Sequence, residues 1–154
     1  MAIRKFSLVT LSTFFYIGYL PFIPGTLASL AAVFLFYLIK DSSLAALFAC
    51  ILIATGFLVA GRAEDIYGKK DARCIVIDEV SGMFLSLLFL PIDIKVILGA
   101  FLIFRLLDTF KPYPAGILEK LKGSGGIMLD DIVAGIYTNI ILQLALRLAT
   151  FRAS

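Results

Sequence analysis

Runs of apolar residues, most of them roughly 12 to 18 residues long, follow one another along the chain, separated by short stretches rich in proline, glycine or charge. Several runs are shorter than the about 20 residues that cross a membrane directly. Of the 154 residues 61% are apolar and 16% charged, too few polar side chains to cover a water-soluble domain. The pattern therefore favours a small membrane protein whose helices are short or tilted spans, with some at the interface.

Helical segments account for nearly all of the chain, because only residues 73–77 have a β-branched character. Pro91 and the polar residues after it divide the stretch 80–104 into two short helices. We expect residues 1–154 to form a single all-α domain, a compact bundle of about six helices, several of them membrane-embedded. The expected crossings are 27–39, 44–61, 80–90, 95–104 and 132–149.

Basic residues gather on one side of these crossings. With a cytoplasmic N-terminus, ten lysines and arginines fall on the inside, whereas only Lys40 and Lys95 fall in outside turns before the last span. Such a bias is typical of cytoplasmic loops. This topology places Arg152 on the outer side of the membrane. A last helix that lies in the membrane interface, instead of crossing the membrane, would avoid this placement. The ten inside residues are Arg4, Lys5, Arg62, Lys69, Lys70, Arg73, Arg105, Lys111, Lys120 and Lys122.

Histidine is absent from the sequence, which excludes a histidine base, a histidine metal ligand and a phosphohistidine. Lipid phosphatases that depend on a catalytic histidine are thereby excluded. Cys50 and Cys74 have no metal-ligand spacing, and we interpret both as structural. Catalysis must therefore rely on carboxylates, on other polar side chains or on a metal ion.

Two pairs of adjacent carboxylates stand where apolar segments begin. Asp78 and Glu79 enter one helix, while Asp130 and Asp131 follow the glycine-rich stretch 123–126 at the start of the last apolar helix. Carboxylates at a membrane edge cost several kcal/mol unless something pairs with them. Hard oxygen ligands of this kind suit Mg²⁺. Helix N-capping is the alternative explanation for each pair taken alone.

A polar seam recurs every four residues along the last apolar segment. Because lipid would not tolerate it, we expect this seam to face the interior of the bundle. Gly82, four residues after Asp78, is expected to leave room above that carboxylate on the same helix face. The members of the seam are Asp131, Gly135, Asn139 and Gln143.

Two further segments carry groups that bind anions. Arg105, Asp108 and Lys111 recur at three-residue spacing, which stacks them on one helix face. The two cations would hold a phosphate while the carboxylate orients them or binds a metal; an interfacial salt-bridge stripe is the alternative. Residues 24–26 open another helix, whose exposed N–H groups would bind an anion, although N-capping by Thr26 is the simpler explanation.

All of these groups fall on the predicted cytoplasmic side of the membrane. Carboxylates that hold a metal, cations that neutralise phosphate oxygens and N–H groups that position the phosphate are the parts of a phosphoryl-transfer site. The sequence thus predicts an acidic site at one membrane edge. A site there indicates a lipid with a phosphorylated headgroup, and the basic face would attract anionic lipid.

The same segments resemble the signatures of the phosphatidylglycerophosphatase A family. They cover nearly the whole chain in order, and the one departure is Ala28, where the family usually has glycine. The matching segments are Pro24-Gly25-Thr26, Ile75 to Glu79, Phe104-Arg105 with Asp108 and Lys111 to Pro114, and Gly126 to Gly135.

The resemblance implies a bacterial inner-membrane enzyme, with its active site facing the cytoplasm, that removes the terminal phosphate of phosphatidylglycerophosphate to give phosphatidylglycerol. It also implies dependence on Mg²⁺ and an all-helical fold whose helices pack around a central one. Nucleic acid is not an expected partner, and protein partners are unknown from the sequence.

Roles for the site residues follow from the resemblance as a hypothesis. Glu79, Asp130 and Asp131 bind Mg²⁺, with Asp78 as a fourth candidate ligand. The ion polarises the phosphate and activates a water molecule, and a carboxylate takes its proton. Asp108 orients Arg105 or joins the metal. Substrate binding falls to Thr26, Arg105 and Lys111.

Other possibilities remain open at this stage. A covalent aspartyl-phosphate competes with direct attack by water, although the Asp-x-Asp-x-Thr pattern of common aspartyl phosphatases is missing. A small ion transporter would place its carboxylates near the middle of the membrane rather than at segment ends. A non-catalytic membrane scaffold would explain the apolar content but not the converging carboxylates.

Overall fold

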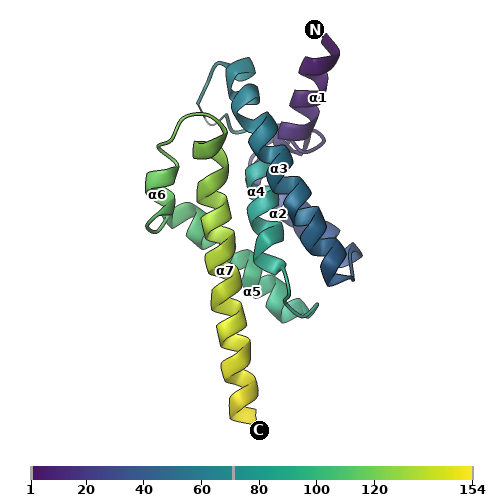
Figure 1. Ribbon diagram of the computed structural model, residues 1–154, viewed down its shortest axis with the longest axis vertical. Coiled ribbons are helices and arrows are strands. Elements are labelled where there is room, and N and C mark those ends of the chain that lie inside the picture. Colours follow the sequence, from purple (N-terminus) through teal and green to yellow (C-terminus); the bar gives the residue numbers. More distant parts are fainter. Residues whose placement is uncertain (1, 71, 154) are drawn as a thin grey trace.

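The computed structural model describes residues 2–70 and 72–153, and the side chains of residues 5–70 and 72–151. Within those residues every regular element is helical and no strand is present, so the all-α prediction is confirmed. The elements, shown in Figure 1, are α1 (Ala2–Ser12), the 3-10 helix η1 (Ile17–Tyr19), α2 (Pro24–Leu38), α3 (Ser42–Tyr67), α4 (Ile77–Leu87), α5 (Ile94–Phe110), α6 (Ala115–Leu118) and α7 (Ser124–Ala153).

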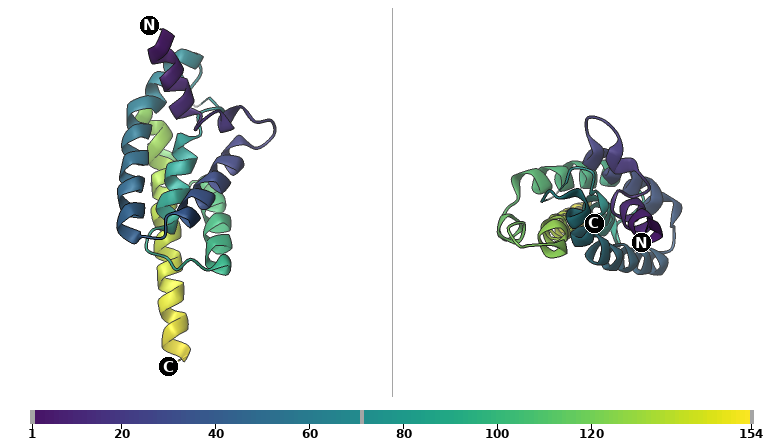
Figure 2. Two further views of the ribbon diagram at one scale, coloured as in Figure 1. Left: turned by 90° about the vertical axis from the view of Figure 1, so that its right-hand side faces the viewer. Right: turned by 90° about the horizontal axis from the view of Figure 1, so that it is seen from above.

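The short helix α4 forms the centre of the molecule, and α2, α3, α5 and α7 pack around it, as the left view of Figure 2 also shows. Nine of its 11 residues are buried, so α4 is a core helix without a face for lipid. Its Phe84 meets the rings of Phe36 from α2 and Phe48 from α3, with ring centroids 5.5 and 5.2 Å apart. Packing around one central helix is what the family resemblance implies.

Side-chain caps and glycine fix the ends of two outer helices. The Asp41 carboxylate accepts the N–H of Leu44 at 2.8 Å at the start of α3, and that helix ends at Gly68, whose φ is 62°. The Asp93 carboxylate accepts the N–H of Lys95 at 2.7 Å at the start of α5. Asp and Gly at these positions satisfy groups that a helix end leaves without partners.

The last helix begins earlier than the predicted segment 132–149. It starts at Ser124, inside the glycine-rich stretch, directly after Gly123 turns the chain with a φ of 66°. Asp130 and Asp131 are therefore the seventh and eighth residues of α7, and capping by either of them is wrong. The cause is that two glycines in sequence are compatible with a helix when tertiary packing holds them there.

The other two capping alternatives are also wrong. α4 begins after Val76 and α2 after Ile23, and neither residue makes a side-chain cap hydrogen bond. Asp78 is the second residue of its helix and Thr26 the third. Both side chains are thus in the first helical turn and do not cap their helices.

Helices α4 and α7 touch backbone to backbone. A Cβ atom on Gly82 would lie 2.5 Å from the carbonyl oxygen of Asp131, and one on Gly135 would overlap the carbonyl of Gly82. Only glycine permits such an approach. The space that the sequence predicted above Asp78 is therefore occupied by the α7 backbone.

The polar seam of α7 faces α4, as predicted. The Asn139 amide donates hydrogen bonds to the carbonyl oxygens of Ser86, at 3.1 Å, and of Leu88, at 2.7 Å. The Gln143 amide in turn donates to the Asn139 side-chain oxygen at 2.7 Å. Because the last carbonyls of α4 have no partners within that helix, Asn139 satisfies groups that would otherwise be costly to bury.

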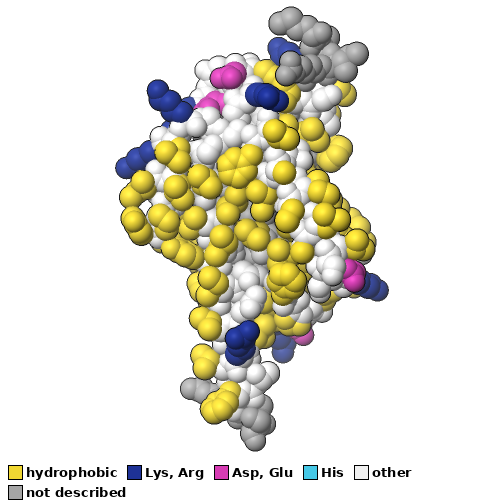
Figure 3. Space-filling view, viewed as in Figure 1, with side chains coloured by type: hydrophobic (Ala, Val, Ile, Leu, Met, Phe, Trp, Pro, Cys, Tyr) yellow, Lys and Arg dark blue, Asp and Glu magenta, His cyan; other side chains and the backbone are white. Residues whose placement is uncertain are grey.

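Two of the described helices, α3 and α7, are long and apolar enough to cross a membrane. The second half of α7 projects beyond the rest of the bundle (Figure 1). The end of α3 and the start of α7 lie at one end of the molecule, and the turns before α3 and α5 lie toward the other (Figure 1). Charged side chains lie toward both ends of a broad hydrophobic surface (Figure 3). The side chains of Arg4 and Arg152, used in the predicted topology, lie outside the described residues.

Replacing Gly82 by alanine is expected to lower the free energy of unfolding by about 1–3 kcal/mol, because the new methyl group forces α4 away from α7. Thermal unfolding in detergent measures the effect. Gly99→Ala is the matched control, since its Cβ would meet only the side chain of Leu142, at 3.6 Å. Equal losses in the two variants would contradict the close contact of α4 with α7.

Candidate active site

Three carboxylates from two helices meet beside the contact between α4 and α7. Asp78 and Glu79 come from the first turn of α4, and Asp131 comes from α7. One oxygen of each lies within 4.8 Å of the others, and both aspartates are buried. The approach at Gly82 brings Asp131 next to α4. The structure thus assembles a group of oxygen ligands that is compatible with a metal ion.

The three clustered carboxylates carry more negative charge than the neighbouring cations neutralise. Burial raises the pKa of Glu79 to about 7; the charge of Asp108 adds to the rise, while a hydrogen bond with Asp78 and the charge of Arg105 oppose it. The Oε2 atom of Glu79 is buried and has no hydrogen-bond partner. Hard oxygen donors with a buried unsatisfied oxygen fit a hard divalent cation. The residues present are therefore compatible with a bound divalent cation.

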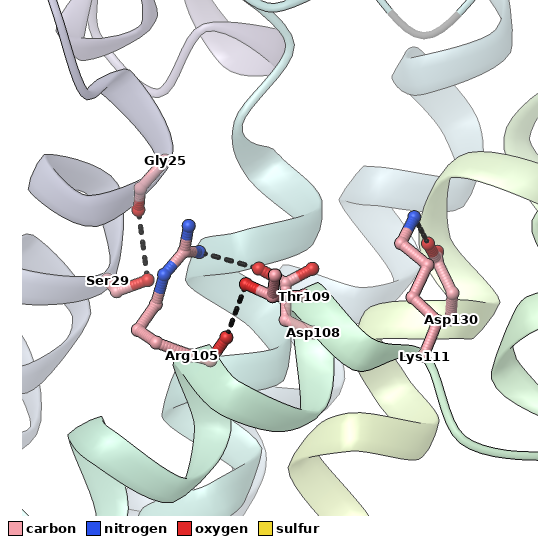
Figure 4. Close-up of polar contacts among 7 residues, drawn as sticks. All are labelled: Gly25, Ser29, Arg105, Asp108, Thr109, Lys111 and Asp130. Carbon is pink, nitrogen blue, oxygen red and sulfur yellow. Dashed lines mark hydrogen bonds and ion pairs between the residues drawn. The ribbon is translucent and has the colours of Figure 1, made fainter.

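Arg105 and Asp108 share one face of α5, as their spacing predicts. The Arg105 guanidinium lies 2.8 Å from the Asp108 carboxylate, and the carbonyl of Arg105 accepts the hydroxyl of Thr109 (Figure 4). Asp108 also interacts with Glu79 and with Asp131. Asp108 therefore pairs with the cation on α5 and adds negative charge beside the carboxylates on α4 and α7.

Lys111 does not continue that face. It is the C-cap of α5, with a left-handed φ of 46°. Its ammonium lies 2.7 Å from Asp130 (Figure 4). The same ammonium lies 2.8 Å from Glu119. Although burial opposes the charged form, these two carboxylates raise the pKa of Lys111 above its usual range. The structure groups Asp130 with Lys111 and not with the three clustered carboxylates, while its Oδ1 atom remains buried without a hydrogen-bond partner.

The start of α2 completes the site. A pocket of about 290 Å³ lies between Thr26 and its neighbours on one side and Glu79 and Arg105 on the other. A Cβ on Gly25 would overlap the Glu79 carboxylate and lie 3.5 Å from the Arg105 guanidinium. A side chain at position 25 would therefore displace the Glu79 carboxylate from its present position. The N–H groups of a helix start favour an anion in such a pocket.

Two residues were missed by the sequence reasoning. Arg73 lines the pocket beside Glu79, but its position before the acidic pair indicated only a charged loop. Glu119 pairs with Lys111 across the segment that contains α6, and no regular spacing connects the two. The position of Arg73, a cation shortly before a buried acidic pair, is the one signal that could have identified it.

Replacing Lys111 by methionine is expected to lower the free energy of unfolding by about 1–3 kcal/mol, because it leaves the buried Asp130 carboxylate without its cation. Adding Asp130→Asn to that variant should recover part of the loss, which a double-mutant cycle on thermal unfolding detects. Lys120→Met, at an exposed position, is the control. Additive effects of the two substitutions would show that the pair contributes no coupling.

Comparison with known proteins places these residues in a family. The family model described as phosphatidylglycerophosphatase A matches residues 10–146. A protein of Escherichia coli named phosphatidylglycerophosphatase A is 37% identical over 129 residues, which are 81% of this chain and 75% of that protein. Its namesake in Haemophilus influenzae is 33% identical over 124 residues, 77% of this chain and 76% of that protein.

A third relative carries a different name. A protein of Bacteroides thetaiotaomicron named putative phosphatidylinositol-3-phosphatase is 32% identical over 147 residues, 89% of this chain and 92% of that protein. No solved structure matches the chain. Because the family model covers most of the sequence and includes every site residue described above, this chain belongs to the phosphatidylglycerophosphatase A family.

Proposed function

We propose that this protein is a membrane phosphatase of phospholipid biosynthesis that hydrolyses the terminal phosphate monoester of phosphatidylglycerophosphate, giving phosphatidylglycerol and inorganic phosphate. One observation carries the proposal: the pocket that joins the start of α2 and Arg105 to Glu79 puts anion-binding groups against a cluster of carboxylates. Membership of the family supports this substrate. The predicted orientation, with the pocket at the cytoplasmic face of an inner membrane, belongs to the same proposal.

The cofactor in this proposal is Mg²⁺, held by Asp78, Glu79 and Asp131. Their oxygen atoms are close enough to share one ion, and Glu79 has a buried oxygen without a hydrogen-bond partner. Asp130 remains a further candidate ligand through its unsatisfied Oδ1 atom. When bound, the ion supplies Lewis-acid polarisation of the phosphate.

The protein's own groups then orient the substrate and move the protons. The N–H groups at the start of α2, with the side chains of Thr26 and Arg105, hold the phosphate oxygens, and Asp108 fixes the direction of the guanidinium. Lys111 adds positive charge from the side of Asp130. A water oxygen attacks phosphorus, the bond from phosphorus to the glycerol oxygen breaks, and a carboxylate accepts the proton of the water. The carboxyl group that has accepted this proton then donates it to the departing glycerol oxygen.

A second substrate has a specific observation in its favour. The relative from Bacteroides thetaiotaomicron, whose match covers most of both chains, is named for a 3-phosphorylated phosphoinositide. That lipid also presents a phosphate monoester beyond a phosphodiester, so the same groups would recognise it. Assays of both lipids side by side decide which one this protein prefers.

Phosphate release from phosphatidylglycerophosphate in detergent micelles is expected to require Mg²⁺ and to stop in EDTA. Asp131→Asn should lower the rate by about 10²–10³-fold, because it removes one charged ligand of the clustered site. Asp93→Asn, in the turn before α5, is the control. Full activity of the Asp131 variant would contradict the role of the carboxylate cluster. No phosphate release from the folded wild type would favour a scaffold, and ion flux in liposomes without phosphate release would favour a transporter.

Direct attack by water predicts that no phosphate stays on the protein during turnover. Acid quenching of a reaction with substrate labelled in its terminal phosphate should leave the label in lipid and inorganic phosphate alone. Label that remains on the denatured chain would instead establish the aspartyl-phosphate route.

A further inference from the structure

A second pocket among the described residues lies apart from the proposed active site. It has a volume of about 710 Å³ and lies between the second half of α3, the turn that follows it and the start of α7. None of the residues described as lining it also lines the pocket beside Glu79. The proposed hydrolysis uses no residue of this pocket.

Positive charge dominates the rim of this pocket. Four cations face two carboxylates, Glu64 and Asp65, which leaves a net charge of +2. All four cations are exposed, so they are able to exchange water for a ligand, and one of them, Lys70, also donates a hydrogen bond to the carbonyl oxygen of Glu119 at 3.3 Å. The excess charge selects an anion. The cations are Arg62, Lys69, Lys70 and Lys122.

The wall below the rim is apolar. Phe57 and Leu58, on the same helix as Arg62 and about one turn before it, are 38% and 61% exposed. Since α3 is long and apolar enough to cross a membrane, the pocket changes from apolar to basic along a membrane normal. In Figure 3, basic side chains at this end lie next to the hydrophobic surface. A phospholipid has the same order, with acyl chains below a charged phosphate, whereas free phosphate would leave the apolar wall without a partner.

The first two residues of the glycine-rich stretch, Gly123 and Ser124, line the pocket where α7 begins. A Cβ on Gly61 would lie 2.7 Å from the backbone nitrogen of Ser124, and the Ser124 hydroxyl accepts the N–H of Gly61 at 2.8 Å. This contact holds the start of α7 against α3. Gly123 and Ser124 line this pocket and not the active-site pocket. The glycine-rich stretch, which precedes the acidic pair in the sequence, therefore belongs to a different pocket from the carboxylate cluster.

We infer that this pocket binds the headgroup of an anionic phospholipid, as an accessory lipid site separate from the one at which hydrolysis takes place. The cations hold the lipid phosphate, and Phe57 and Leu58 contact the glycerol and the first acyl carbons. The inference rests on α3 and α7 lying in a membrane and not on the identity of the hydrolysed substrate.

The test measures lipid retention by the full chain. The protein is placed in nanodiscs of equal parts phosphatidylcholine and phosphatidylserine, the latter being neither substrate nor product of the proposed reaction. Native mass spectrometry then counts the lipids that stay bound. Wild type should retain phosphatidylserine in preference. The double variant Arg62→Gln/Lys122→Gln should weaken this preference at least about tenfold, since each cation near the lipid surface contributes about fivefold.

Lys40→Gln/Lys95→Gln is the matched control, because it removes two exposed lysines from the turns before α3 and α5. Its preference for phosphatidylserine should equal that of wild type. Equal losses in both double variants, or no preference in wild type, would overturn the inference. Thermal unfolding confirms that each variant is folded before its lipids are counted.

Two further arms separate the alternatives. Excess inorganic phosphate should not displace the retained lipid; displacement would show a site for free phosphate and overturn the inference. Hydrolysis of phosphatidylglycerophosphate in neutral detergent should be unchanged in Arg62→Gln/Lys122→Gln, and a lost activity would make the pocket part of the active site instead. Lipid preference in a wild type without phosphatase activity would reject the proposed function and leave this site standing.

Discussion

The contact between the backbones of α4 and α7 is the constraint on which the site depends. Two glycines on facing helices let the chains approach more closely than any side chain would allow, and Asp131 lies at the point of contact. Because Asp78 and Glu79 begin the same short helix, the approach that packs the core also assembles the carboxylates. Fold and site therefore share one structural cause, and a larger residue at Gly82 would disturb both.

The electrostatic consequence is an excess of negative charge in a poorly hydrated place. Arg105 pairs with Asp108, and Lys111 pairs with Asp130 and Glu119, so both of these cations are already engaged. Glu79 responds with a raised pKa. A carboxylate group of this kind is expensive to bury alone and becomes favourable once a divalent cation or a bound phosphate with its counterion completes it.

Much of this arrangement was predictable from the sequence, and the exceptions have physical reasons. Apolar runs interrupted by proline and glycine gave the order of the helices, and the three-residue spacing of Arg105 and Asp108 predicted their contact. The early start of α7 was missed because glycine has a low intrinsic helix propensity, which packing against α3 overrides here. The pairing of Lys111 with Glu119 was missed because Lys111 itself has a left-handed backbone at the end of α5, which turns its side chain away from the helix face.

The position of Asp131 along α7 has a consequence for how a lipid reaches the site. Asp131 is the eighth residue of a helix that rises about 1.5 Å per residue, so the carboxylates lie about 10 Å along the helix axis from its start. With α7 crossing a bilayer from an interfacial Ser124, this depth is that of the glycerol backbone rather than of the aqueous phase. The terminal phosphate would then arrive sideways from the lipid layer. Turnover at such a site follows the mole fraction of substrate in the membrane surface rather than its concentration in the surrounding water.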